Sequence, residues 1–410
     1  MTMMLEGAVQ GMRREPPTIA SQEVESQPHR VFRLHRALTP VVKRDDGVYV
    51  ALRASDVVGL VTDARTRQME TEMAASRGVV EGALFDFFKH TMLLSNGLDH
   101  RRRRMPVARA FAYNLITQLR PRIRAIAHQI IDTHLPKGRM NLVEDFASWV
   151  PARVICEILG IPPHDIPEFT RHVYKLARAL SSSFKREDVP ELQEAARELS
   201  LYTRGLLQDR RARPAADFLT SYVAALDESE QLSAVEALIQ IVTLILAGSD
   251  TTRGAIAIQV SLLLQHPWQW VAVCRDAALI PGAVAECLRY EPSVGSFMRI
   301  ALEDIELDGW TIPRNSMLSL STLSAMRDPA LYFDPDRFDI TRTDHPRKHL
   351  VFGGGVHYCL GAALAMAELE ECLAALTERL PHLQLGGEPL PVRGSGGIRT
   401  IGDIQVRWPV

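Results

Sequence analysis

Near its C-terminal end the chain reads Phe352-Gly353-Gly354-Gly355-Val356-His357-Tyr358-Cys359-Leu360-Gly361. A cysteine follows a glycine-rich turn and precedes a helical pattern that runs from Leu360 to Leu380. Backbone N–H groups and the positive end of a helix at this point would lower the pKa of the thiol, which suits a permanent metal ligand. The glycines remove side chains where a flat, bulky group could press on the backbone. The alternative is a buried cysteine in a glycine turn, which is common in proteins.

The pattern Phe-x-x-Gly-x-His-x-Cys-x-Gly resembles the haem-ligand loop of the cytochrome P450 family. In that family the cysteine thiolate is the axial ligand of the haem iron. The resemblance implies haem b (iron protoporphyrin IX) as the cofactor and Cys359 as the metal ligand. It also implies that the haem contacts the remaining signature residues of the loop, Phe352, Gly353, His357 and Gly361.

A long helical pattern runs from Ser233 to His266 and ends at Pro267. The four residues that open it, Ser233-Ala234-Val235-Glu236, match a capping box, which marks the start of a helix. At about 1.5 Å per residue the helix would be roughly 50 Å long, the width of a domain. Because Ala237–Leu246 is apolar nearly all round, we expect this helix to lie in the centre of the fold.

Midway along this helix stands Ala247-Gly248-Ser249-Asp250-Thr251-Thr252. An acid and two hydroxyls are costly to bury there unless they have partners or a task. The alternatives are a polar patch satisfied by water, or a threonine that bonds back to a backbone carbonyl. The segment resembles the P450 signature over the haem. That resemblance implies haem contacts from Ala247 and Gly248, and catalytic proton delivery by Asp250 and Thr251.

The two threonines of this segment are expected to differ in role. Thr251 stands four residues after Ala247 and therefore shares its helix face. Thr252 is rotated from Thr251 by about 100° and is predicted to bond to the backbone instead.

Two further groups of charged residues agree with the resemblance. Glu286 and Arg289 share one helix face and resemble the family's structural Glu-x-x-Arg pair, whose third member is predicted to be Arg337. Such a pair alone is weak evidence, because most are solvated surface pairs. Four basic side chains match the positions that hold the haem propionates in the family: His100, Arg104, Arg299 and His357.

Composition sets limits on the function. The chain has 410 residues, a net charge of −2 and 46% hydrophobic residues. The charge argues against general nucleic-acid binding. The five cysteines are odd in number and lack metal-pair spacing, which suits free thiols in a reducing cytoplasm. The start has no apolar stretch long enough for a signal or a membrane anchor, so a soluble, cytoplasmic and monomeric bacterial protein is expected.

The expected fold is mainly α, with a small β region, and the P450 resemblance implies a triangular helical domain. The haem would lie between the long central helix and the helix after the cysteine ligand. Residues 1–28 are predicted to be loose and residues 29–410 to form a single haem domain. A strand is predicted at Val48–Leu52 and a hairpin around Asp308-Gly309. Helices are predicted at Leu98–Leu119, Pro121–Leu135, Asn141–Leu159, Asp165–Ser181, Pro190–Arg211, Ala215–Leu226, Trp268–Ala278 and Pro281–Tyr290.

The substrate is expected to be a hydrophobic small molecule, because family topology places apolar residues on the pocket walls. These walls would come from Val79–Leu94, Phe169–Phe184, Leu244–Ala247, Val294–Phe297 and Gly396–Ile398. Half of the aromatic rings in the first wall could simply pack the domain. Lys89 and His90 could receive a carboxylate, although a solvated pair is the simpler interpretation.

The resemblance implies a monooxygenase that inserts one oxygen atom from O2 into its substrate. No dinucleotide-binding Gly-x-Gly-x-x-Gly lies between a strand and a helix, so electrons must come from an acidic ferredoxin and its NAD(P)H-dependent reductase. The predicted docking patch comprises Arg101, Arg102, Arg103, Arg109, Arg347 and Lys348. The alternatives are a haem-binding sensor or carrier without turnover, and a peroxide-driven enzyme. Asp250 and Thr251 favour the monooxygenase, since neither alternative needs a proton relay.

Overall fold

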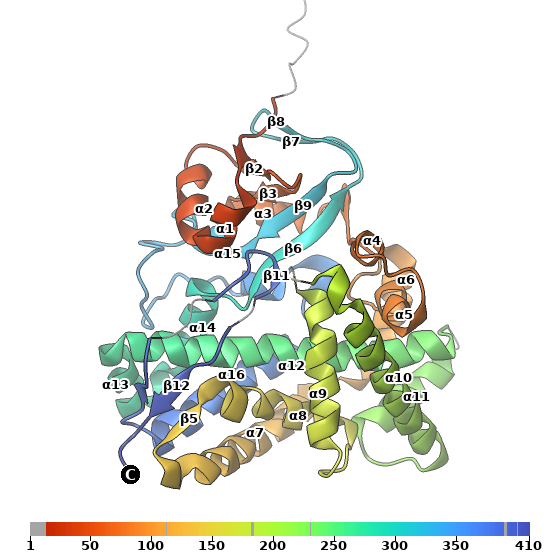
Figure 1. The fold of residues 1–410 in the computed structure, drawn as a ribbon, viewed down its shortest axis with the longest axis vertical. Coiled ribbons are helices and arrows are strands. Elements are labelled where there is room, and N and C mark those ends of the chain that lie inside the picture. The colour runs from red at the N-terminus through yellow and green to blue at the C-terminus, as the bar shows by residue number, and fades with distance from the viewer. Residues whose placement is uncertain (1–13, 112, 182–183, 230, 389–391, 400) are drawn as a thin grey trace, which may run out of the picture.

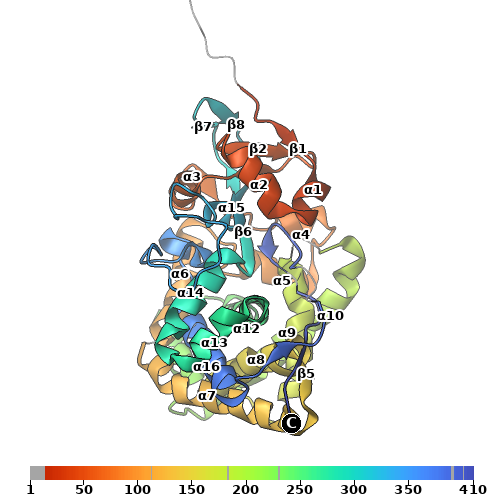
Figure 2. The same ribbon diagram turned by 90° about the vertical axis from the view of Figure 1, so that its left-hand side faces the viewer.

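A computed structural model describes residues 14–111, 113–181, 184–229, 231–388, 392–399 and 401–410. Helices form a broad base and strands gather at the narrower end, which gives the molecule a triangular outline (Figure 1). The longest helix, α12 (Ala234–Gln265), crosses the base. Seen end-on, it lies in the middle of the helical layer, with other helices around it (Figure 2).

The chain is mainly helical. The helices of eight or more residues besides α12 are α2 Pro28–Arg36, α5 Gly82–His90, α6 Gly97–Ala110, α7 Tyr113–His134, α8 Trp149–Leu159, α9 Ile166–Ala177, α10 Val189–Ala212, α11 Phe218–Ser229, α13 Pro267–Arg275, α14 Ile280–Tyr290 and α16 Ala362–Arg379. The shorter ones are α1 Ser21–Ser26, α3 Ala54–Leu60, α4 Glu72–Ser76 and α15 Thr322–Ala325.

The strands form three sheets. The largest has the order β1 (Thr18–Ile19), β2 (Val41–Arg44), β3 (Tyr49–Ala51), β9 (Met317–Ser321), β6 (Val294–Ala301) and β11 (Gly397–Ile398), with β4 (Thr66–Arg67) also paired to β6. A second sheet joins β10 (Gln384–Leu385), β12 (Gln405–Arg407) and β5 (Arg139–Asn141), and the third is the hairpin of β7 (Ile305–Leu307) and β8 (Trp310–Ile312). Strand β6 matters most here, because it runs from the helical base towards the apex and carries Arg299.

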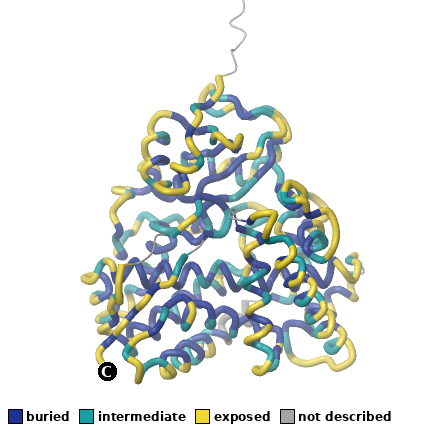
Figure 3. Tube along the Cα trace, viewed as in Figure 1, coloured by how far each residue is buried: buried dark blue, intermediate teal, exposed yellow. Residues whose placement is uncertain are grey.

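Helix α12 has the boundaries and the central position that its sequence predicts. The Ser233 hydroxyl accepts the N–H of Glu236, and the Glu236 carboxylate accepts the N–H of Ser233, which completes the capping box. Its apolar window is 72% buried, so this helix, although long and apolar enough to cross a membrane, is a core helix of the protein. Figure 3 shows the buried interior of the base in dark blue beneath exposed outer loops.

Some predicted boundaries are wrong. The helix predicted at Leu98–Leu119 is divided at Phe111, and Pro121 lies inside α7 instead of starting a helix. The break occurs where the Phe111 ring packs edge-on against Phe218 of α11, with 6.1 Å between the ring centroids. Tertiary packing therefore sets this boundary, and the proline is accommodated within the helix.

Part of the segment predicted to be loose is ordered. Within residues 14–28, β1 pairs in parallel with β2, and α1 buries Val24 completely. Residues 1–13 lie outside the described residues. The polar composition of this segment hid a short apolar anchor, because the buried side chains of Pro16, Ile19 and Val24 and two residue pairs between β1 and β2 suffice to dock it.

The hairpin predicted at Asp308-Gly309 is confirmed. Both residues have a positive φ, +48° and +78°, which is the requirement for a two-residue turn between β7 and β8. The strand predicted at Val48–Leu52 corresponds to β3. Helices α8 and α9 begin later than predicted, since a π-helical turn, Leu142–Ala147, precedes α8.

A buried charge network joins α14 to the long loop before the cysteine. Arg289 and Glu286 are fully buried, and Arg289 Nε donates to Glu286 Oε2 at 2.6 Å. Arg289 also donates to the backbone carbonyls of Met326, Pro335 and Arg337. The guanidinium thus fixes the path of this loop, because buried carbonyls need donors.

The third charged member of this network is not Arg337, as predicted, but Arg342. The Arg337 side chain is 60% exposed and pairs with Asp339. The Arg342 side chain is 6% exposed, with Nε 3.4 Å from Glu286 Oε2, and it donates to carbonyls of the same loop. Arg337 contributes only its backbone carbonyl to the network. The sequence pattern cannot show whether a residue takes part through its backbone or through its side chain.

Replacement of Arg342 should therefore destabilise the protein far more than replacement of Arg337. Arg342→Ala leaves Glu286 partly unpaired in the interior and should lower the free energy of unfolding by about 3 kcal/mol. Arg337→Ala, the matched control on the surface, should change it by less than about 0.5 kcal/mol. Chemical denaturation monitored by circular dichroism measures both, and equal effects of the two substitutions would contradict this assignment.

Candidate functional site

A central cavity of about 350 Å3 lies between α12, the loop that carries Cys359, and strand β6. Its walls also include residues of α8, the segment before α6, and β11. Most of the lining is aliphatic or aromatic, which suits a flat apolar group and an apolar substrate.

Cys359 is the only cysteine among the residues that line this cavity. Its backbone N–H donates to the carbonyl of Phe352 at 2.8 Å, which closes the loop below the thiol. The residue is accessible from the cavity that it lines, although protein atoms surround it closely enough for burial to affect its thiol. Of the other four cysteines, Cys156, Cys287 and Cys372 are buried, and burial raises the pKa of each thiol, as it also does for the partly exposed Cys274.

The expected lowering of the Cys359 pKa is wrong for the free thiol. Burial raises its pKa, while the N–H of Gly361 and the charge of Arg104 act in the opposite direction. Desolvation of a thiolate in an apolar cavity outweighs two favourable contacts. A bound metal ion would change this balance, because a coordinating thiol is deprotonated outright.

The glycines of the loop are needed for its close packing. Gly353 has a φ of +73°, which favours glycine, and a Cβ at Gly354 would come within 2.6 Å of Val61 at the end of α3. Phe352, Gly353, His357 and Gly361 all line the cavity as predicted. The loop is thus held against the end of α3, with backbone conformation favouring glycine at position 353 and close packing favouring it at position 354.

Four basic side chains meet at one wall. Arg104 Nη2 donates to the Tyr358 carbonyl at 2.6 Å, and the rings of His100 and His357 lie 4.0 Å apart. Arg299 Nη1 donates to Gln68 Oε1 and to a backbone carbonyl, both at 2.9 Å. His100 itself does not line the cavity but supports His357 from behind, and Pro106 does not disturb its helix.

This wall is a buried cluster of bases without acids. Burial lowers the pKa of Arg299 to about 10, and burial followed by Arg104 lowers that of His100 to about 4. Burial, reinforced by His100, Arg299 and Arg104, lowers the pKa of His357 to about 3. Within the described part of the chain, no carboxylate forms a hydrogen bond or ion pair with any of the four. His100 Nε2 is buried without a partner. The cluster therefore fits an anionic group, such as the two propionates of a haem.

Helix α12 supplies the facing wall. Ala247, Gly248, Thr251 and Thr252 all line the cavity. The Thr251 hydroxyl donates to the Ala247 carbonyl at 2.7 Å. The back-bond predicted for Thr252 is thus made by Thr251, and no hydrogen bond of the Thr252 hydroxyl is observed among the described residues. A Cβ at Gly248 would lie 2.8 Å from Ile155 Cδ1, so close packing against α8 requires glycine there.

Asp250 lies behind this wall and not on it. Its carboxylate is 9% exposed and has Arg253 Nη2 2.6 Å from Oδ1, at an angle that does not make a hydrogen bond. The Arg253 guanidinium lies over the ring of Tyr174 in α9, 4.6 Å from its centroid. The Asp250 Oδ1 atom is thus buried next to a cation but receives no hydrogen bond from the described residues.

One acid of the cavity was missed by the sequence reasoning. Glu368 of α16 lines the cavity, is 1% exposed and has a carboxylate oxygen without a partner. Burial raises its pKa well above the usual range, which favours the protonated form. An acid in the middle of the apolar stripe that includes Leu364 and Ala367 was the available signal.

The predicted pocket walls are largely found. Met92, Leu93, Leu94, Leu180, Leu244, Val294, Phe297 and Ile398 line the central cavity. Three predicted rings do not: Phe87 is buried in the core, and Phe85 and Phe88 line a different pocket. Two methionines, Met69 and Met73, complete a wall that was not predicted.

The predicted basic patch is smaller than expected. Arg102 and Arg103 both bind Glu236, and Arg102 also binds Asp99. Arg109 lies 3.6 Å from Glu228. The exposed Arg101, Arg347 and Lys348 have no carboxylate partner in the described residues.

Comparison with known proteins gives matches to a family model, to related proteins and to solved structures. A family model for cytochrome P450 matches residues 276–401. The chain is 42% identical over 393 residues to the plant-inducible cytochrome P450-pinF1 of Rhizobium radiobacter, covering 96% of this chain and 93% of that protein. It is 38% identical over 324 residues to the mycinamicin IV hydroxylase/epoxidase of Micromonospora griseorubida, covering 78% and 80%. The structure of the myxobacterial cytochrome P450 CYP267B1 in complex with myristic acid superposes with a TM-score of 0.85 at 32% identity, covering 95% and 98%.

Arg299 offers a direct test of the basic wall. Arg299→Met should preserve the fold but weaken haem retention by about 10-fold, because one buried charge-assisted contact to a propionate is lost. The rate at which haem passes to an excess of apomyoglobin measures retention, and circular dichroism checks the fold. Arg337→Met, on the surface, is the control and should not change the rate. Equal rates for Arg299→Met and the wild type would contradict the assignment.

Proposed function

This chain belongs to the cytochrome P450 family and is a P450 monooxygenase, and on that premise we propose that it inserts one oxygen atom of O2 into a hydrophobic small molecule. The reaction would be C–H hydroxylation or epoxidation, with two electrons from a ferredoxin partner. The observation that carries this proposal is the meeting of Cys359, Thr251 and an apolar lining in one cavity. The proposal takes residues 29–410 as a single haem domain, acting as a cytoplasmic monomer.

The cofactor of this family is haem b, which supplies oxygen activation when it is bound. We assign Cys359 as its metal ligand, because this is the one cysteine that lines the cavity in the described residues. Arg104, Arg299 and His357 would hold the propionates, with His100 supporting His357. Charge-assisted hydrogen bonds from such buried donors are strong because no water competes for them.

Thr251 and Asp250 are the proposed catalytic residues. The Thr251 hydroxyl lines the cavity and is oriented by its own bond to the Ala247 carbonyl. Since that bond uses the hydroxyl proton, Oγ1 keeps its lone pairs free to accept a proton from water. Rotation of the hydroxyl then passes a proton into the cavity, and Asp250, one residue away, would resupply the water.

The alternative of a sensor or carrier without turnover explains less. A sensor needs the cysteine, the basic wall and the apolar pocket, but it does not need an acid and a hydroxyl beside them. A peroxide-driven enzyme is disfavoured for the same reason.

An apolar substrate is supported by the lining, which combines aliphatic residues of α12 with methionines and aromatic rings. Two similar proteins act on or bind molecules of this kind, a mycinamicin hydroxylase/epoxidase and a P450 in complex with myristic acid. Methionine side chains adapt their shape readily, so the Met69 and Met73 wall would tolerate related skeletons.

The proposed ferredoxin site lies on the side of Cys359. Leu98 and Val356 are 81% and 72% exposed, and they belong to the two segments that His100 and His357 bring together, with 4.0 Å between the ring centroids. Arg101 and Lys348 flank them, and Lys348 lies over the Tyr358 ring. An apolar centre with unpaired basic residues around it suits an acidic partner, itself reduced by an NAD(P)H-dependent reductase.

The coupling of electron consumption to product tests the catalytic assignment. Thr251→Ala should keep haem and substrate binding and NAD(P)H consumption. It should release most of the oxygen as hydrogen peroxide, because the hydroxyl that delivers protons into the cavity is removed. Thr252→Ala on the adjacent position is the matched control and should stay coupled. The measurement is the ratio of product to NAD(P)H consumed in a reconstituted system. Uncoupling by Thr252→Ala alone would assign the role to the other hydroxyl.

The redox contact should respond to salt and to charge reversal at the unpaired basic residues. The Debye length falls from about 10 Å at 0.1 M salt to about 3 Å at 1 M, so reduction by the cognate ferredoxin should slow as salt rises. Lys348→Glu should slow it at low salt, whereas Arg102→Glu should act mainly by disturbing Glu236. Stopped-flow reduction under carbon monoxide measures the rate. A rate indifferent both to salt and to Lys348→Glu would exclude this surface.

A further inference from the structure

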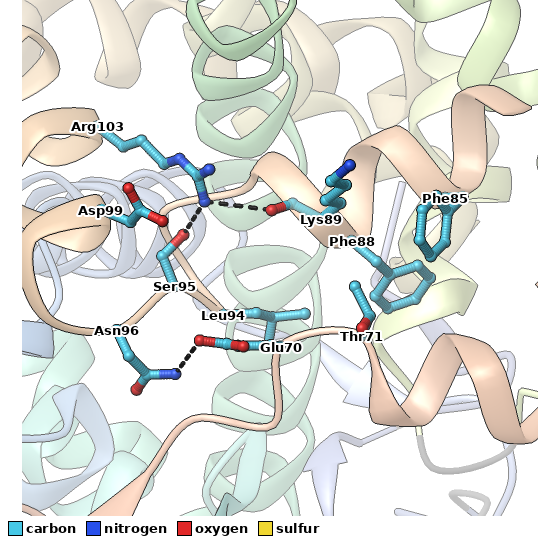
Figure 4. A pocket seen from close by; sticks show the side chains of 10 residues that line it. All are labelled: Glu70, Thr71, Phe85, Phe88, Lys89, Leu94, Ser95, Asn96, Asp99 and Arg103. Atoms are coloured by element: carbon cyan, nitrogen blue, oxygen red, sulfur yellow. Dashed lines mark hydrogen bonds between the residues drawn. The ribbon is translucent and has the colours of Figure 1, made fainter. Parts of the chain in front are cut away.

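A second cavity of about 310 Å3, here called the side pocket, lies beside the central cavity. It is formed by the segment after β4, by α5 and by the start of α6 (Figure 4). Phe85, Phe88 and Leu94 provide its apolar surface, while Glu70, Lys89 and Asp99 stand among its polar residues. None of these polar residues belongs to the site described above.

Only two short chain segments separate the side pocket from the central cavity. Met69 lines the central cavity, and the next residue, Glu70, lines the side pocket. Leu93 lines the central cavity, Ser95 lines the side pocket, and Leu94 between them lines both. A single leucine side chain is thus shared by the two cavities, and such a side chain can change rotamer within nanoseconds.

The charges of the side pocket are nearly all paired. Arg103 binds Glu236, Ser95 Oγ and the Lys89 carbonyl, and Asp99 accepts from Arg102. Glu70 accepts from the Asn96 amide at 2.8 Å. In Figure 4 the Glu70 carboxylate is directed at Asn96, apart from the ammonium group of Lys89.

Lys89 is the exception. It lies in the last turn of α5, its residue is exposed, and its ammonium group has no hydrogen bond or ion pair in the part of the chain that the structure describes. Beside it the rings of Phe85 and Phe88 provide an apolar surface, while most of the other residues that line the side pocket are polar. An unpaired cation beside apolar rings in a mostly polar pocket is complementary to the charged end of an amphipathic anion.

We propose that the side pocket is the second half of the substrate site, where Lys89 binds the carboxylate of an elongated amphipathic substrate whose apolar part extends past Leu94 into the central cavity. This inference rests on the proposed function, since it assigns a substrate class to the same reaction. The substrate would be a carboxylic acid with a long apolar chain. Its oxidation would occur far from the carboxylate, because the anchored end stays outside the central cavity.

A matched pair of probes separates the charge from the chain. Dodecanoic acid and dodecan-1-ol share the apolar chain, and at pH 8 the acid is ionised. Each is titrated into the ferric holoprotein, and the haem absorption change gives the dissociation constant. Lys89→Met keeps the length of the side chain and removes its charge, Lys89→Arg keeps the charge, and Lys348→Met removes an unpaired cation on the Cys359 side.

Lys89→Met should raise the dissociation constant of dodecanoic acid by about 10-fold, the effect of one charge-assisted contact, and leave that of dodecan-1-ol unchanged. Lys89→Arg should retain binding of the acid, and Lys348→Met should change neither probe. Leu94→Trp should close the passage and weaken both probes, while imidazole, which binds the iron directly, still binds.

Three results would overturn the inference. Lys89→Met could leave the acid unaffected, it could weaken both probes equally, or the wild type could respond to neither probe. In the last case a wild type that shows the red-shifted carbon monoxide spectrum of a haem thiolate keeps the proposed function and loses only this assignment. A wild type without that spectrum would remove the proposed function itself.

Discussion

The uncompensated positive charge on one wall of the central cavity is the constraint on which the rest of the site depends. Arg104 and Arg299 carry this charge, and the neutral rings of His100 and His357 lie beside them. The four side chains come from three parts of the chain, α6, β6 and the cysteine loop, and burial works against protonation of each. Such a cluster is costly in an empty interior, since buried charges need partners. An anionic cofactor repays that cost and, by doing so, holds α6, β6 and the cysteine loop in one arrangement. The protein is therefore built to be completed by its haem.

The buried network of Glu286, Arg289 and Arg342 positions the chain that leads to the cysteine. It binds the carbonyls of Met326, Asp334 and Arg337 and so fixes the first part of the loop before the cysteine without any help from the cofactor. The cysteine loop is then positioned from one side by ion pairs and from the other by Val61 and Thr62, which leave no room for a Cβ at Gly354. Burial raises the pKa of the Cys359 thiol, because water does not stabilise the thiolate there. The rigid support of the loop therefore has to hold the thiolate in position.

The sequence predicted those parts of the structure in which a residue type, in its local pattern, has few alternative roles. Cys359 in its glycine loop, the capped apolar helix α12, and the bases of the propionate wall each have few alternatives, and the structure brings them together. The failures have a common cause. Arg337 and Arg342 are equivalent in the sequence, and so are Phe85 and Met92, since only the path of the chain decides which side chain turns inward. Thr251 and Thr252 differ in the same way, because a back-bond depends on the local bend of α12.

Pairing of charges is the least visible property in the sequence, and it determines what the surface can do. The run Arg101–Arg104 looks like one basic patch, yet its members have three different fates: Arg101 is exposed, Arg102 and Arg103 share Glu236, and Arg104 enters the cavity wall. Glu236 also caps α12, so one acid both starts the central helix and neutralises two arginines. Of the basic residues considered for docking and substrate binding, four form no ion pair within the described part of the chain. They are Arg101 of α6, Arg347 and Lys348 before the cysteine loop, and Lys89 at the side pocket. A cation that the fold leaves without a partner, next to an apolar surface, is free to bind a partner from outside. The same reasoning therefore supports both the proposed electron-transfer face and the proposed substrate end of the cavity.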